Sequence, residues 1–140
     1  MTYDLQRFKD AQEWDYGQAL AEIRAGRKRS HWIWYVFPQL KGLGRSSMCE
    51  RYGIDGMGEA KAYLGDEILR SRLVEVSQAL LELSGDDPVS VMGHIDALKL
   101  RSCMTLFSRV PGSNPVFGAV LDKYYDGEPD PLTLEMLRRG

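Results

Sequence analysis

Between His31 and Arg45, the chain gathers aromatic and basic side chains that could bind a flat, charged small molecule. Trp32 and Trp34 follow His31 closely, and Arg45 and Ser46 end a glycine-rich stretch. Aromatic rings stack on flat ligands, and a glycine-rich loop ahead of a helix can present backbone N–H groups to an anion. The same rings could equally belong to the hydrophobic core, and the glycines could serve only a turn.

Two further groups of charges have both a ligand-binding and a structural interpretation. Arg72 falls on the apolar side of the helix predicted for 66–83, so its guanidinium needs a carboxylate, a carbonyl or an anionic ligand. The basic run 24–29 could contact a phosphate, or it could stabilise the end of a helix that stops at Gly26. The structural interpretation is favoured for both groups.

The helix predicted for 94–108 carries polar residues on an otherwise apolar surface. Asp96 and Lys99 stand three residues apart, and Ser102 and Thr105 follow them. An Asp–Lys pair could orient a substrate or transfer a proton, but it could also be an ordinary ion pair along a helix.

Several kinds of site are not indicated. His31 and His94 match no zinc-binding spacing. Cys49 and Cys103 form no CxxC pair, and Cys103 lies in an apolar stretch typical of a core. No P-loop and no GxSxG nucleophile motif is present. We therefore predict no metal and no cofactor, and we propose no catalytic triad from the sequence.

Composition narrows the class of protein. The 140 residues carry a formal net charge of -2, with 44% hydrophobic and 27% charged residues. Proteins that coat nucleic acid usually carry a positive excess, so nucleic-acid binding is not expected. No apolar run reaches the length of a membrane span, and the N-terminus lacks a signal-peptide pattern. We predict one cytoplasmic domain over residues 1–140.

Apolar residues recur at helical spacing along most of the chain, which predicts an all-α fold. The expected helical segments are 12–25, 46–53, 58–64, 66–83, a short turn after 87, 94–108, and two that start at 114 and 130. The segment 30–38 favours a strand by propensity, but no second strand could pair with it, so a short helix or an irregular buried segment is preferred. The prediction is a single compact domain of about seven or eight helices, several of them short.

Four strings of the sequence point to a family. They are HWIWYVFPQLKGLG at 31–44, YGI at 52–54, EAKAYL at 59–64 and DALKLRSCMTLF at 96–107. The chain resembles the bacterial domain-of-unknown-function 1810 family, whose members are sometimes mislabelled calpastatin. The resemblance covers nearly the whole chain, and it implies a small, mainly α-helical domain without an established activity. Calpastatin is an unstructured repeat protein, whereas this chain has core-forming periodicity throughout.

The leading hypothesis joins these features in one cleft. We predict that the His31–Arg45 segment, Arg72 and the helix at 96–105 meet around an anionic, nucleotide-like small molecule. In this site the residues expected to contact the ligand are His31, Trp32, Trp34, Arg45, Ser46, Arg72, Asp96, Lys99 and Ser102. The two tryptophans form its apolar wall, and His31 and Asp96 are the groups best able to move a proton.

Two other functions stay open at this point. One is a non-catalytic protein–protein interaction module, which an exposed apolar patch away from the His31 segment would favour. The other is an enzyme that acts on a nucleotide-derived substrate, which differs from the leading hypothesis only by turnover.

Overall fold

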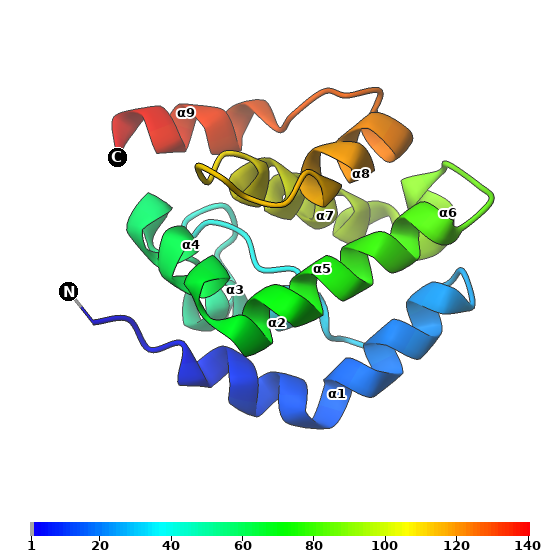
Figure 1. Cartoon of the computed structure of the whole chain (residues 1–140), viewed down its shortest axis with the longest axis horizontal. Helices are drawn as coiled ribbons and strands as arrows, with labels where there is room; N and C mark the ends of the chain where they lie inside the picture. The colour runs from blue at the N-terminus through cyan, green and yellow to red at the C-terminus, as the bar shows by residue number, and fades with distance from the viewer. Residues whose placement is uncertain (1) are drawn as a thin grey trace.

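The computed structural model describes residues 2–140, which fold into nine α-helices without a strand beyond one isolated bridge (Figure 1). The helices are α1 (Gln6–Arg24), α2 (Ile33–Val36), α3 (Ser47–Tyr52), α4 (Gly56–Gly65), α5 (Glu67–Glu82), α6 (Pro88–Met92), α7 (His94–Ser108), α8 (Val116–Tyr125) and α9 (Pro131–Arg139). The predicted all-α architecture is confirmed, with three short helices among the nine.

Helix α7 is the central element of the fold. It packs against α2, α4, α6, α8 and α9. Leu100, Cys103 and Phe107 are fully buried, as are Met104 and Leu106. A helix that is apolar around most of its circumference must be covered on several sides, as the sequence indicated.

Helix α1 begins at Gln6, six residues before the predicted start at Gln12. No side chain caps this end, so the usual sequence signal for a helix start is missing. Tertiary contacts stabilise the first turns instead. Phe8 is fully buried, with its ring centre 5.1 Å from that of Tyr63, and Arg7 forms an ion pair of 2.9 Å with Glu59.

The aromatic segment forms a single helical turn, α2, rather than a strand. Trp32, Ile33 and Phe37 are almost completely buried, and Tyr35 is buried as well. Its backbone continues into an isolated bridge between Leu40 and Ile54. The core interpretation therefore holds for most of the aromatic rings, while Trp34 is only half-buried.

Capping side chains explain where four other helices begin. Ser46, Asp66, Asp87 and Asp130 each accept a hydrogen bond from a backbone N–H in the first turn of α3, α5, α6 and α9. Proline follows Asp87 and Asp130 at the first helical position, as the sequence indicated.

Candidate functional site

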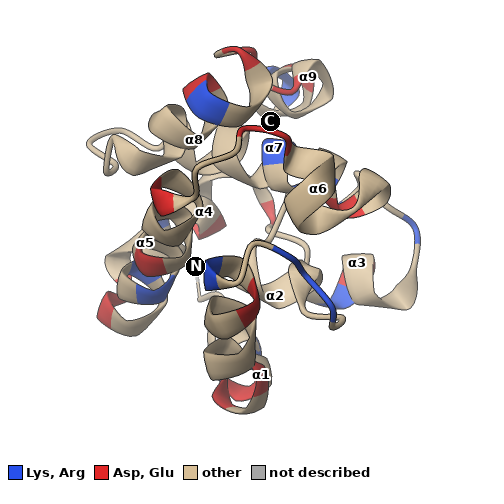
Figure 2. Cartoon of the chain, turned by 90° about the vertical axis from the view of Figure 1, so that its right-hand side faces the viewer, with Lys and Arg blue, Asp and Glu red and all other residues tan. Residues whose placement is uncertain are grey.

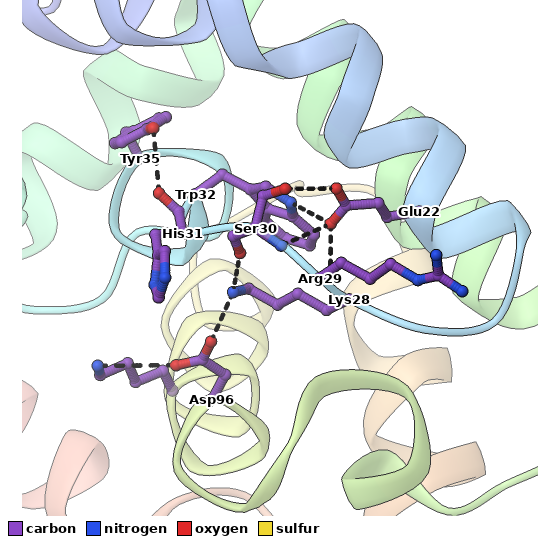
Figure 3. Close-up of polar contacts among 9 residues, drawn as sticks. Glu22, Lys28, Arg29, Ser30, His31, Trp32, Tyr35 and Asp96 are labelled. Atoms are coloured by element: carbon purple, nitrogen blue, oxygen red, sulfur yellow. Dashed lines mark hydrogen bonds and ion pairs between the residues drawn. The ribbon is translucent and has the colours of Figure 1, made fainter.

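The loop between α1 and α2 folds around the carboxylate of Glu22 (Figure 3). Its Oε1 accepts hydrogen bonds from the N–H of Arg29 at 2.7 Å, the N–H of Ser30 at 3.0 Å and the indole N–H of Trp32 at 2.9 Å. Its Oε2 accepts from the Ser30 hydroxyl at 2.6 Å and from the Gln18 amide at 3.0 Å. Trp32, predicted as part of a ligand-binding wall, therefore lies in the interior with its polar atom satisfied.

These hydrogen bonds keep Glu22 ionised. Burial by itself raises the pKa of this carboxyl, but the hydrogen bonds from Ser30, Arg29 and Trp32 outweigh burial and lower the pKa to about 2. Glu22 is therefore a fixed negative charge that orders the loop, and it is not suited to carry protons near neutral pH.

Next to this loop, one carboxylate on α7 is shared by two lysines. Lys28 Nζ lies 2.8 Å from Asp96 Oδ2, and Lys99 Nζ lies 3.8 Å from Asp96 Oδ1. Lys28 is held further by the carbonyl of Ser30, and its ammonium lies 4.9 Å from the centre of the Trp32 ring. Figure 3 shows Lys28 reaching from the loop to Asp96. Lys28 and Lys99 together with Asp96 therefore carry a net charge of one positive unit.

Trp34 lies next to Lys99. The Lys99 ammonium is 5.3 Å from the centre of the Trp34 ring, a distance typical of a cation–π contact. The Trp34 indole N–H is buried but has no hydrogen-bond partner within residues 2–140. The ring borders a cavity of about 10 Å³ together with Gln39 and Cys49, room for about one water molecule.

His31 and the outer face of α7 complete this surface. The His31 side chain is exposed, and Figure 3 shows its imidazole on the side where Lys28 and Asp96 lie. Ile95 and Leu98 are 68% and 60% exposed. Because Ile95 is one helical turn from Lys99, this apolar surface adjoins Lys99 on α7. We call His31, Trp34, Asp96 and Lys99 the Trp34 surface.

The structure does not bring Arg72 to the Trp34 surface. Its guanidinium lies between α5 and α1, 3.3 Å from Gln12 Oε1 and 5.3 Å from the centre of the Tyr16 ring. The inward direction expected for this side chain is confirmed, but its partners are an amide and an aromatic ring. Arg72 thus supports the packing of α1 on α5.

Ser102 and Thr105 hold the start of α9. The single Ser102 hydroxyl proton has two acceptors within reach, the carbonyl of Leu98 at 3.1 Å and Asp130 Oδ2 at 3.3 Å. The Thr105 hydroxyl donates to Arg101 O at 2.8 Å and accepts the N–H of Asp130 at 2.8 Å. Both hydroxyls, expected near a ligand, have structural partners.

Ser46 and Arg45 lie in the loop before α3. The Ser46 hydroxyl, expected to contact a ligand, accepts the N–H of Cys49 at 3.2 Å and so caps α3. A Cβ at Gly44 would collide with Cys49 Sγ, so this glycine is required for close packing. Arg45 is exposed on this loop. The structural interpretation of the glycine-rich stretch is therefore favoured.

Comparison with known proteins agrees with the resemblance seen in the sequence. Residues 2–137 match the model of a family described as Protein of unknown function (DUF1810). The chain belongs to this family. The crystal structure of the conserved hypothetical protein Rv1873 from Mycobacterium tuberculosis matches this DUF1810 chain with a TM-score of 0.95 and 46% identity over 97% of each chain. No curated protein matches the chain.

Both cysteines of this DUF1810 protein are buried. Cys103 is fully buried, and burial raises the pKa of its thiol, which makes it a poor nucleophile. Within residues 2–140, no cluster of three histidine, cysteine or acidic side chains could hold a metal ion, and no helix is both long and apolar enough to cross a membrane.

Sequence reasoning missed two charged residues beside the Trp34 surface, Glu22 on α1 and Lys28 in the basic loop between α1 and α2, which is blue in Figure 2. Glu22 is buried on α1, next to the fully buried Ile23. A carboxylate at such an inward position needs hydrogen-bond donors, and this requirement could have identified Glu22 from the sequence. Lys28 was treated as part of a basic helix end, whereas its side chain turns inward to Asp96 and is 7% exposed.

Proposed function

We propose that this protein binds an anionic small molecule with a flat, apolar part, such as a nucleotide, at the Trp34 surface. The position of Lys99 carries the proposal. Its ammonium lies 5.3 Å from the centre of the Trp34 ring and 3.8 Å from a carboxylate that Lys28 already neutralises. A cation with a shared counter-ion can pair with an incoming anion while the neighbouring ring stacks on the ligand.

Three neighbouring groups support the same ligand chemistry. The exposed His31 imidazole can donate a hydrogen bond to an anion. The Trp34 indole N–H has no partner within the described chain, and the cavity beside the ring has room for a water molecule through which it can donate to a bound acceptor. The exposed side chain of Ile95 offers apolar contact beside Lys99.

Tryptophan fluorescence provides a direct test. The chain has three tryptophans, of which Trp14 is 87% exposed and Trp32 is 1% exposed. In a Trp14→Phe variant, a change in emission on adding ligand therefore reports mainly on Trp34. We expect saturable quenching by ATP and AMP, because the base stacks on the ring. Inorganic phosphate should compete with them without quenching.

Two variants connect the signal to the site. Lys99→Met keeps most of the aliphatic stem and removes the charge, so the dissociation constant for ATP should rise about tenfold, equivalent to about 1.4 kcal/mol. Trp34→Phe should abolish the quenching. Arg109→Gln is the matched control, since Arg109 is an exposed cation at the end of the same helix. Lack of saturable quenching by either nucleotide at millimolar concentration, or equal affinity of the wild type and Lys99→Met, would overturn the proposal.

A further inference from the structure

A larger cavity lies apart from the Trp34 surface. It has a volume of about 660 Å³, within the range of small-molecule sites. The end of α4, much of α5 and the connection between α7 and α8 line it. Figure 1 shows this connection, drawn in gold, facing α4 and α5. We call this cavity the α4–α5 groove.

The base of the α4–α5 groove is apolar. Leu64, Val110 and Phe117 are buried residues that line it, and Val74 lining it from α5 is half-buried. Covering the exposed edges of these side chains with the apolar part of a ligand is favourable, because it removes apolar surface from water. The groove therefore suits an aromatic or aliphatic body.

One wall of the groove is a preformed turn. The N–H of Ser113 donates to the carbonyl of Val110 at 3.1 Å, and Gly112 has a φ of +75°. Pro111 precedes this glycine, so Pro and Gly occupy the two central positions that a type II turn favours. Because proline fixes its own φ, the wall needs little ordering when a ligand enters.

Two cations stand at one side of the groove. The Arg70 guanidinium donates to the carbonyl of Leu64 at 2.8 Å, which holds it at the end of α4. Lys61 lies one helical turn before Leu64. Within residues 2–140, neither cation forms an ion pair. Glu75 also lines the groove, but its carboxylate accepts a hydrogen bond from the Tyr16 hydroxyl.

We infer that the α4–α5 groove binds a small organic anion in which a carboxylate or sulfonate is joined to an apolar body. The apolar base takes the body of the ligand, and Lys61 and Arg70 take its acidic group. The inference is independent of the proposed function, because the lining residues of the groove do not belong to the Trp34 surface.

The fluorescent probe 1-anilinonaphthalene-8-sulfonate has this chemistry and brightens in an apolar site. We expect saturable binding to the wild type, displacement by octanoate, and amide shifts in NMR spectra at Gly65, Gly112 and Ser113. The neutral analogue N-phenyl-1-naphthylamine lacks the sulfonate. It should bind about tenfold more weakly than the sulfonate, since it cannot form charge-assisted hydrogen bonds.

The double variant Lys61→Gln/Arg70→Gln separates charge recognition from folding. It should bind the sulfonate about tenfold more weakly and the neutral analogue unchanged, so that the preference for the anion disappears. Val74→Glu should weaken both probes, and Arg109→Gln, outside the groove, should affect neither. An unchanged preference in the double variant, or probe-induced shifts confined to residues outside the groove, would overturn the inference.

Discussion

Trp32 and Trp34 are separated by one residue, yet they lie in two very different environments. Trp32 is 1% exposed, and its indole N–H donates to a carboxylate that also accepts from the surrounding loop. Trp34 is half-buried beneath the Lys99 ammonium, with an indole N–H that lacks a partner in the described chain. Trp32 precedes α2 with non-helical backbone angles, whereas Trp34 lies within its single turn, so the two side chains leave the backbone toward different surroundings.

The surroundings of Trp32 and Trp34 differ in how many of their polar groups still lack a partner within the protein. Donors of Arg29, Ser30 and Trp32 converge on the Glu22 carboxylate. Both carboxylate oxygens therefore already have hydrogen-bond partners within the protein. Around Trp34, the Lys99 ammonium shares its only carboxylate with Lys28 within residues 2–140 and so retains capacity for an external partner. A dense aromatic string can thus contain both a core contact and a candidate binding surface.

The largest expected effect comes from removing the acceptor on the Trp32 side. Glu22→Ala leaves the buried N–H groups of Ser30 and Trp32 without their acceptor, so the free energy of unfolding should fall by about 3 kcal/mol. Urea denaturation measures this change. Glu13→Ala, on the exposed side of the same helix, is the control and should change it by less than about 0.5 kcal/mol. Equal effects of the two substitutions would contradict the role given to Glu22.

Low pH should lower the free energy of unfolding by protonating Glu22, the acceptor on the Trp32 side. The pKa of Glu22 is lowered from 4.5 to about 2, because hydrogen bonds outweigh the burial that raises it. A lowered pKa in the folded state gives stability that is complete above pH 4.5 and is lost as the pH falls toward 2. At about 1.4 kcal/mol per pH unit, the loss amounts to about 3 kcal/mol.

Comparison with Glu22→Gln isolates this acid effect. Asp66, whose pKa is also lowered, contributes equally to both proteins. Chemical denaturation across this pH window should therefore show a steeper decline in the wild type than in Glu22→Gln. Parallel declines would show that Glu22 does not carry the effect.

A matched pair of tryptophan substitutions compares the two sides directly. Trp32→Phe should cost about 2 kcal/mol, because a fully buried ring shrinks and Glu22 loses a donor. Trp34→Phe should cost less than about 1 kcal/mol, since its N–H has no bond to lose. Thermal unfolding of both variants provides the comparison. A larger loss for Trp34→Phe would reverse the assignment of core and surface.

The smallest effect concerns the loop after the aromatic string. Ser46→Ala removes a helix cap and should cost about 1 kcal/mol, while Ser47→Ala, within the helix, should be close to neutral. Urea denaturation distinguishes the two. The Ser46→Ala variant should keep the nucleotide-dependent quenching of Trp34, and loss of that quenching would show that Ser46 contacts the ligand.

The fold was predictable where a local signal marked each element. Asp87 and Asp130, each followed by proline, marked the starts of α6 and α9, and both aspartates cap these helices. The start of α1 lacks such a signal, because the residue before the helix is Leu5, whose side chain cannot accept a hydrogen bond from the first turn. Its first turns depend on Phe8 and Arg7, whose partners lie more than forty residues away in the chain.

The candidate site was also predictable only in part, because residue types are visible in the sequence and the contacts between distant residues are not. The approach of the His31 segment to the helix carrying Asp96 and Lys99 was anticipated from residue type. Arg72 was expected to point inward, but periodicity shows only the side of a helix and not the residue that faces it. Lys28 resembled an ordinary basic helix end, because its contact with Asp96 exists only after the loop meets α7.

The attachment of α9 has a consequence for how the molecule opens. Thr133 is the buried residue of this helix. Its first turn is secured where the Ser102 hydroxyl donates to the Asp130 carboxylate and the Asp130 N–H donates to the Thr105 hydroxyl. Met136 and Leu137 near its other end pack against the core but are only half-buried, so α9 can detach with less exposure of apolar surface than α7. The amide protons of α9 should therefore exchange with deuterium much faster than those of α7, and a protease should cut the chain first at its C-terminal end.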